Sequence, residues 1–285
     1  MVKLLLEEGA LLEALNDDND TPLHLAACTG HTSIVELLLE KGTPVGAINE
    51  ANRTPLHHAA LHGNTSTVEL LLEKGALVGA MTASNYTALH LSALRGRTTT
   101  VELLLRKGAL IDARDELDDT PLHFATKAGH TGTVELLLRN GASVEATNSS
   151  NYQPLHLAAR RKNISILEML LKGGASIGAM GRGGNSPMHL AAENGHTSPV
   201  EVLLRNGASI EALNEDNNTP LHLAARNGYI GMVELLLSKG ASIGALNRHN
   251  YTPLQLAELK GHKGIAQLLR NKAAAELAAH GNRVE

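Results

Sequence analysis

Aromatic residues are scarce in this chain of 285 residues, which has four tyrosines, one phenylalanine and no tryptophan. Leucine and alanine dominate instead. A large globular core usually contains bulkier side chains, whereas Leu and Ala favour helices that pack at close, regular spacing. The length would allow two ordinary domains or one elongated array, and the composition favours the array.

Cysteine is nearly absent as well. The single cysteine, Cys28, has no second cysteine with which to form an intramolecular disulfide, and a cysteine-based zinc site cannot be assembled. Because a chain without disulfides fits a reducing compartment, we predict a cytoplasmic location.

Long apolar runs and an excess of one charge are also missing. No segment approaches the length that a membrane span needs, and an amphipathic stretch follows Met1 in place of a signal-peptide core. The formal net charge is −4, from 25 basic and 29 acidic residues that are interspersed. We therefore expect neither membrane insertion nor nucleic-acid binding.

What the sequence does contain is a repeat of 33 residues. A T-P-L-H tetrapeptide or a close variant begins at Thr21, Thr54, Thr87, Thr120, Gln153, Ser186, Thr219 and Thr252. A glycine lies nine residues after each start and another twelve residues later, and the exceptions are Lys162 and Ala273. A period of this length indicates supersecondary units that stack in a row.

Each repeat predicts two helices and a connector. The Thr is placed to cap a short helix, with Pro in its first turn. The two glycines end the first and second helices through left-handed conformations. Two residues before each Thr stands Asn, Asp or Gly, which tolerate positive φ in a tight turn. We therefore predict an all-α solenoid of stacked helix pairs with β-turn or hairpin fingers.

This pattern resembles the ankyrin repeat, and the resemblance covers almost the whole chain. It implies an L-shaped unit in which fingers and first helices line a concave groove and second helices form the back. It also implies that the motif His binds the neighbouring Thr and the backbone and so ties repeats together. The function that it implies is a protein-protein interaction scaffold without catalytic activity.

The repeats divide the chain into three parts. We predict a partial N-terminal repeat over residues 1–14, with only its second helix, and eight repeats that form one domain over residues 15–272. Residues 273–285 form a helical extension and tail. Because Ala273 replaces the terminating glycine, we expect the final helix to end near Gly281.

The chain opens midway through a repeat, since residues 2–9 match the V-E-L-L-L-E-K-G block in register. This favours the hypothesis that the sequence is a segment of a longer protein with more repeats upstream. As an isolated domain we expect a monomer.

The 15 histidines invite a metal or catalytic hypothesis. Seven of them occupy the motif, namely His24, His57, His90, His123, His156, His189 and His222. Four more recur ten residues after the motif starts, namely His31, His130, His196 and His262. Residues that recur at fixed repeat positions indicate structural roles, so we expect no metal site.

Other chemistry has weaker support. Gly181, Gly183 and Gly184 could suggest a phosphate loop, but no predicted strand precedes them and they align with a finger, which favours a turn. No H-E-x-x-H, G-x-S-x-G or P-loop pattern is present. We expect neither a nucleophile built on Cys28 nor a cofactor.

Candidate partner-binding residues follow from the resemblance. In the family, the variable contact positions lie four, three and one residues before the motif Thr and seven and eight after it. These positions carry Tyr, Leu and basic residues, which are typical of binding hot spots. The candidates are Tyr86, Leu94, Arg95, Leu117, Lys127, Tyr152, Arg160, Arg161 and Tyr251. The alternative is that the three tyrosines only shield the neighbouring turn.

Repeat five also carries Lys162 at the first glycine position. Either Lys162 adopts the left-handed conformation at a cost of roughly 1 kcal/mol, or that conformation shifts to Asn163. With Arg160 and Arg161, Lys162 could form a basic patch for an acidic motif on a partner, or it could belong to a solvated helix end.

Three functions are compatible with these observations. The first is a non-enzymatic scaffold that binds a partner protein or peptide on the concave face, with repeats three to five at the centre. The alternative is the recruiting segment of a larger enzyme, toxin or effector that binds a substrate or host target. The third is an intrinsic hydrolase or metal activity built from the histidines.

Overall fold

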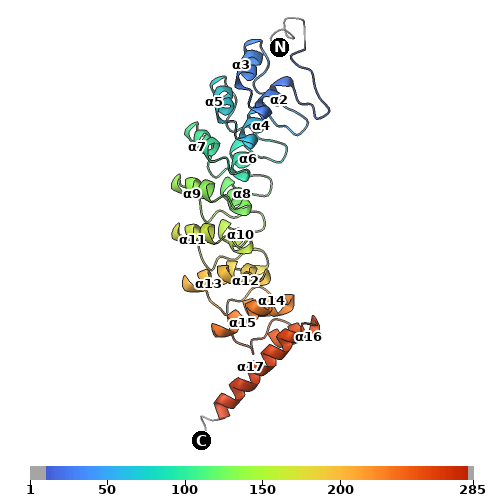
Figure 1. The fold of residues 1–285 in the computed structure, drawn as a ribbon, viewed down its shortest axis with the longest axis vertical. Helices are drawn as coiled ribbons and strands as arrows, with labels where there is room; N and C mark the ends of the chain where they lie inside the picture. Colours follow the sequence, from blue (N-terminus) through green and yellow to red (C-terminus); the bar gives the residue numbers. More distant parts are fainter. Residues whose placement is uncertain (1–10, 282–285) are drawn as a thin grey trace. The chain divides into compact units, whose positions relative to one another are not determined.

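The computed structural model describes residues 11–281, and within that range it contains helices, turns and loops but no strand. The chain divides into two compact units, residues 1–149 and residues 150–285. The partial repeat predicted for residues 1–14 lies almost wholly outside the described residues. The all-helical repeat architecture is confirmed (Figure 1).

Unit one holds repeats one to four, each a pair of helices. Its helices are α2 (Pro22–Thr29), α3 (Thr32–Glu40), α4 (Pro55–His62), α5 (Thr65–Glu73), α6 (Ala88–Leu94), α7 (Thr98–Arg106), α8 (Pro121–Ala128) and α9 (Thr131–Arg139). The first helices α2, α4, α6 and α8 contact one another in succession, and the second helices α3, α5, α7 and α9 do the same. The unit therefore has an inner and an outer layer of helices.

Unit two repeats the same plan. Its helices are α10 (Pro154–Arg160), α11 (Ile164–Lys172), the short 3-10 helix η1 (Arg182–Gly184), α12 (Pro187–Glu193), α13 (Thr197–Arg205), α14 (Pro220–Asn227), α15 (Ile230–Ser238), α16 (Pro253–Leu259) and α17 (Lys263–Gly281). Past Ala273, α17 continues to the residue at which we expected the final helix to end.

The helix boundaries have the causes that the sequence suggested. In repeat one, Thr21 is extended (φ −80°, ψ 165°) and its hydroxyl accepts a hydrogen bond from the N–H of His24, while Pro22 begins the helix. Gly30 ends that helix at φ 75°. The finger residues two before each motif have positive φ as predicted, for example Asn19 at 60°.

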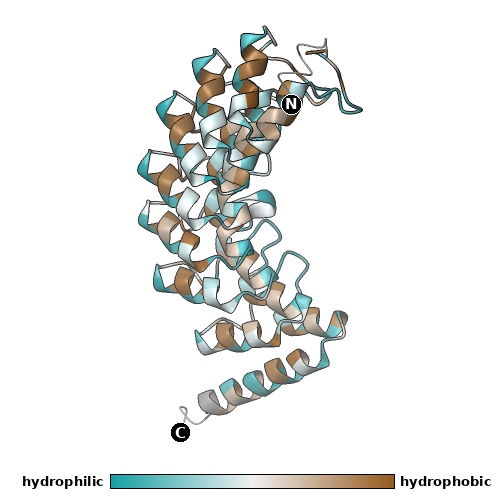
Figure 2. Ribbon diagram, turned by 45° about the horizontal axis from the view of Figure 1, so that its top comes forward, coloured by the Kyte–Doolittle hydropathy of each residue, from teal (hydrophilic) through white to brown (hydrophobic). Residues whose placement is uncertain are grey.

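The core of each unit is built from the repeated aliphatic positions. In α3, Val35 and Leu38 are buried while Glu36 is exposed, so one face of the helix points inward at the i, i+3 spacing. Leu23 from the motif of α2 is fully buried. Burying one such side chain stabilises the fold by about 1.5–3 kcal/mol. Figure 2 shows the hydrophobic residues on the helices and hydrophilic residues on many of the turns.

Within each unit, the motif histidine joins one repeat to the next. In repeat two, Nδ1 of His57 accepts a hydrogen bond from the backbone N–H of Thr54 at 3.0 Å and lies 2.9 Å from the Thr54 hydroxyl. This fixes the proton on Nε2, which donates to the carbonyl of Tyr86 in the next finger at 3.1 Å. His24, His90, His189 and His222 make the same bond 29 residues onward. The bridging role that the resemblance implied is confirmed.

Burial keeps these histidines neutral. Desolvation, the largest cause, lowers the pKa of His57 and of His90 from the usual 6.5 to about 4, against hydrogen bonds to backbone carbonyls that act to raise it. Protonation would place a hydrogen on Nδ1, where the Thr N–H already donates. The folded state therefore excludes a proton that the unfolded chain binds readily.

Lys162 itself adopts the left-handed conformation, with φ 58°, and Asn163 does not, with φ −92°. Of the two alternatives that the sequence left open, the strained lysine is the correct one. The Asn163 side chain caps the following helix by accepting from the N–H of Ile166 at 3.4 Å.

Acid should destabilise the chain through the motif histidines. Because the pKa of His57 is lowered, its contribution to stability is complete above the unfolded value of 6.5 and is lost as the pH falls toward about 4. His57→Gln should lose part of this dependence, since Gln255 naturally accepts from the N–H of Thr252 at 2.8 Å in repeat eight. At neutral pH the variant should lose about 1 kcal/mol with the Nε2 bond.

The measurement is urea unfolding followed by circular dichroism at neutral pH and at a pH near 4.5. An unchanged pH dependence in His57→Gln would contradict this account of the motif histidine.

A second prediction concerns the strain at Lys162. Lys162→Gly should raise the free energy of unfolding by up to about 1 kcal/mol, because glycine has no Cβ to disfavour the left-handed conformation. Lys162→Ala is the matched control, since it removes the charge but keeps the Cβ. If both variants raised the free energy of unfolding equally in urea unfolding, the effect would come from the lost charge, and the strain at Lys162 would be refuted as its cause.

Candidate functional site

The fingers are held together by a ladder of buried Asn and Asp side chains. Oδ1 of Asn49 accepts from the N–H groups of Ala51 and Arg53 at 3.0 and 2.9 Å, which shapes the finger. Nδ2 of Asn49 donates to Oδ1 of Asp20 on the preceding finger at 2.8 Å. The backbone N–H of Glu50 adds a bond to the carbonyl of Asp18. The fingers are thus rigid supports for the side chains that they expose.

The side-chain bond of this ladder joins the residue just before one motif to the residue five before the next. It recurs as Asn148 to Asp119, Asn214 to Asn185 and Asn247 to Asn218, at 2.8 to 2.9 Å. Sequence reasoning missed these residues. The signal was present, because Asn stands five before a motif wherever Asp or Asn ends the preceding finger.

This pairing is interrupted after Arg53, where Thr82 takes the place of Asn, and at Tyr86 and Tyr152. Tyr86 precedes its motif, and the residue five before the next motif is Asp115 in place of Asn; Tyr152 is followed in the same way by Gly181. Each tyrosine therefore replaces a member of the ladder with a side chain on the face formed by the fingers and first helices, which we call the finger face.

In unit one, Tyr86 is half-buried and stacks edge-on against Phe124, with ring centroids 5.4 Å apart and planes at 85°. His90 lies 5.5 Å from the same Phe124 ring. Burial, and then the carboxylates of Asp115 and its neighbours, raise the pKa of the Tyr86 hydroxyl. The ring is fixed in place, which also fits the alternative that it shields the turn, while its remaining surface faces solvent.

The other candidates of unit one lie around this cluster at the predicted positions. Arg95 and Lys127 are exposed at or near the ends of α6 and α8. Leu94 is half-buried, and its carbonyl accepts from Nε2 of His130 at 3.0 Å. Leu117 on the fourth finger is 53% exposed, so it offers an apolar surface on a rigid turn.

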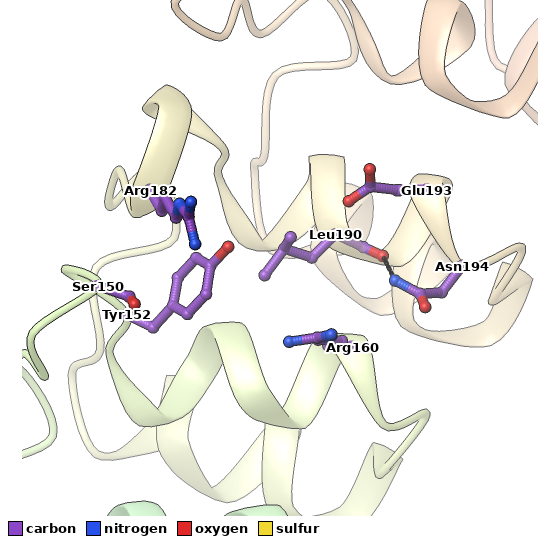
Figure 3. Close-up of a pocket in the computed structure, with 7 residues that line it drawn as sticks. All are labelled: Ser150, Tyr152, Arg160, Arg182, Leu190, Glu193 and Asn194. Carbon is purple, nitrogen blue, oxygen red and sulfur yellow. Dashed lines mark hydrogen bonds between the residues drawn. The ribbon is translucent and has the colours of Figure 1, made fainter. Parts of the chain in front are cut away.

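In unit two, Tyr152 and Arg160 come together at a groove of about 410 Å³ (Figure 3). Its lining residues are Ser150, Tyr152, Arg160, Arg182, Leu190, Glu193 and Asn194. Figure 3 shows the Tyr152 ring beside Arg182, with Leu190 across from it and Arg160 below. The walls come from the finger before α10, which carries Ser150 and Tyr152, from the finger of η1 and from helices α10 and α12.

The groove depends on a glycine. A Cβ at Gly181 would overlap the Tyr152 ring and approach Nε2 of His156. The Tyr152 and His156 rings lie 5.4 Å apart at 38°. Gly181 therefore opens the space that Tyr152 fills, and the glycines that could have suggested a phosphate loop form a finger turn with η1, as predicted.

Two cations of the groove lack an acidic partner. Glu193 is held by Arg226 at 3.2 Å. Arg160 and Arg182 are exposed and form no ion pair with the described residues. The local charge of the groove is therefore positive on a chain whose net charge is −4.

Two predicted residues lie outside the groove lining. Arg161 is exposed and follows α10 as its C-cap, next to the strained Lys162. Tyr251 is 40% exposed in repeat eight, and its carbonyl accepts from Nε2 of His222 at 3.0 Å. Arg182, Glu193 and Asn194 were overlooked, although they stand four before and seven and eight after Ser186, the contact positions of the rule already applied.

The motif histidines are occupied by hydrogen bonds, and the Cys28 thiol is not activated. In repeats such as the second, both ring nitrogens of the motif histidine already hold hydrogen bonds, which leaves no lone pair for a metal. Residues 11–281 contain no group of three or more His, Cys, Asp or Glu side chains arranged to hold an ion. Burial raises the pKa of the Cys28 thiol, so the nucleophilic thiolate is disfavoured.

Within the described part of the chain, no helix is both long and apolar enough to cross a membrane.

The sequence profile of the family described as "Ankyrin repeats (3 copies)" matches residues 1–82, 45–115, 89–181, 155–247 and 188–280. Among solved structures, the human ASB11 ankyrin repeat domain is similar, with a TM-score of 0.71 and 28% sequence identity. The alignment covers 78% of this chain and 99% of that chain. No curated protein matches the sequence.

The packing of Tyr152 against Gly181 can be tested directly. Gly181→Ala should lower the free energy of unfolding by about 1–3 kcal/mol through overpacking, because its Cβ would meet the Tyr152 ring. In a Tyr152→Ala background the cost should largely disappear. Gly178→Ala is the control, since nothing lies within 4 Å of a Cβ there. The measurement is urea unfolding. If Gly181→Ala lowered the free energy of unfolding equally in both backgrounds, the overlap with the Tyr152 ring would not be the cause.

Proposed function

The chain belongs to the ankyrin-repeat family, and we propose that it acts as a non-enzymatic scaffold that binds another protein through its finger face. Ankyrin repeats are in general protein-protein interaction modules. The second helices form the opposite layer and contribute to the core with their apolar residues. The proposal therefore assigns cohesion to the repeated residues and recognition to the residues that vary between repeats.

One observation carries the proposal, namely the exchange of a stabilising bond for an aromatic side chain. Where Asp20 precedes its motif, it accepts a buried bond from Asn49. At Tyr86 and Tyr152 that bond is replaced by a partly exposed ring. A net hydrogen bond is worth about 1 kcal/mol, so its replacement at the surface favours a role in recognition.

The chemistry of the surrounding residues agrees with this role. The Tyr86 ring packs against Phe124, and the Tyr152 ring packs against the backbone at Gly181. Both side chains are already ordered, so they lose little conformational entropy on binding. Leu117 adds apolar area, and Arg95 and Lys127 add charge at the rim of the same unit. Such rigid aromatic anchors with a polar rim are typical of protein interfaces.

Binding without catalysis is also supported by the state of the reactive groups. The motif histidines form the hydrogen bonds between repeats, and burial raises the pKa of the Cys28 thiol, which disfavours the nucleophilic thiolate. A single thiol of this kind fits a cytoplasmic protein. We expect the chain to act as a monomer and to need no cofactor.

The proposal is tested by affinity capture with the wild-type chain and with single variants. Tyr86→Ala and Tyr152→Ala, examined separately because they lie in different units, should each weaken a captured partner by about tenfold or more, as expected for hot-spot residues. Circular dichroism should report an unchanged helix content.

Matched controls lie on the outer layer. Arg106→Ala and Lys172→Ala alter exposed residues of second helices and should leave the affinity as it is. If these controls lost binding and the tyrosine variants kept it, recognition would lie on the layer of second helices, and the proposal would be refuted.

A further inference from the structure

We propose that the groove around Tyr152 in unit two recognises an acidic peptide segment, in which Asp or Glu residues flank an apolar side chain. This inference rests on the proposed scaffold function and goes beyond it by giving the chemistry of the partner. The charge, the anchoring surface and the rigidity of the groove support it.

The positive charge of the groove indicates a negatively charged ligand. Arg160 and Arg182 stand on different sides of the groove and have no ionic partner among the described residues. Glu193, the acidic residue in the lining, is neutralised by Arg226 at 3.2 Å. Arginine binds carboxylates in a bidentate manner, so the two guanidinium groups fit two separate carboxylates.

The basic character extends to one side. Arg161 and Lys162 follow Arg160 directly and are exposed. On the other side, the next finger carries the exposed Glu215, whose backbone N–H binds the carbonyl of Gly183 at 3.0 Å. This polarity orients the ligand, with its more acidic end toward repeat five.

Between the two arginines the Tyr152 ring offers an apolar contact surface. Leu190 lies across from the ring (Figure 3) but is only 2% exposed, so an aliphatic or aromatic residue of the ligand would pack mainly on Tyr152. Asn194 donates from Nδ2 to the carbonyl of Leu190 at 2.8 Å, which leaves its Oδ1 as an acceptor for a peptide N–H.

The groove is formed before a ligand arrives. Gly181 and His156 hold the Tyr152 ring. Gly184 leaves no room for a Cβ against the backbone N of Glu215, so the finger is tied to its neighbour. A preformed site loses little entropy when it binds a flexible segment.

A peptide fits these features better than a nucleic acid. The groove pairs two arginines that have no acidic partner among the described residues, on a chain of net charge −4, so a long polyanion would meet repulsion from the acidic residues elsewhere. A short acidic segment places its charge only at the groove.

The test is selection of random short peptides displayed on phage against the full-length chain. The selected sequences should be enriched in Asp and Glu next to an aliphatic or aromatic residue. A synthetic peptide from this set, followed by fluorescence anisotropy, should bind the double variant Arg160→Ala, Arg182→Ala about tenfold more weakly or worse. Raising the salt from about 50 to about 500 mM should also weaken binding to the wild-type chain.

The matched control is Lys172→Ala, Arg205→Ala, which removes the same charge from exposed ends of second helices in the same unit and should bind like the wild-type chain. Selection of basic or neutral peptides would overturn the inference, and so would equal weakening by this control. Tighter binding of single-stranded oligothymidylate than of any selected peptide would also overturn it, in favour of a nucleic acid.

The outcome also separates this inference from the proposed function. Selected peptides that respond to Tyr86→Ala but not to the arginine variants would leave the scaffold function standing and reject the acidic groove. A chain that selects no peptide and captures no protein would reject both.

Discussion

The hydrogen bond from the motif histidine to the next finger is the constraint on which the other features depend. His57 can bridge Thr54 and the carbonyl of Tyr86 only as a neutral ring with its proton on Nε2. Burial secures that form by lowering its pKa. Since a single helix pair cannot bury its apolar face, this bond and the stacked aliphatic layers set the spacing at which each repeat presents its finger.

The Asn and Asp ladder is a second set of bonds between successive fingers. A step forms only where one finger ends in Asp or Asn and the next carries Asn. Asp20 and Asn49 form one step in unit one, and Asn218 and Asn247 form one in unit two. Where a tyrosine ends a finger, the step is absent and the next finger changes with it, most visibly at Gly181. The proposed recognition residues thus replace a hydrogen bond of the ladder, and the sequence of the neighbouring repeat differs at the position that would have formed it.

Much of the candidate site follows from repeat position alone. The rule that selected Tyr152 and Arg160 also selects Arg182, Glu193 and Asn194, because all stand at contact positions of consecutive repeats. Phe124 was not foreseen, since it stands at a position where other repeats carry Leu or His and its role arises only from the Tyr86 ring beside it. The sequence did not decide whether Lys162 or Asn163 adopts the left-handed conformation, and in the structure Lys162 adopts it.

The sequence by itself determined the helix pairs, their caps, the left-handed turns and the all-helical class, because these depend on residues within one repeat and on a period that recurs eight times. Which variable side chains meet was decided only by the tertiary structure. Tyr152 and Arg160 belong to repeat five, whereas Gly181 and Arg182 belong to the finger of repeat six. Their cooperation requires one repeat to lie against the next, and a local pattern contains no information about that contact.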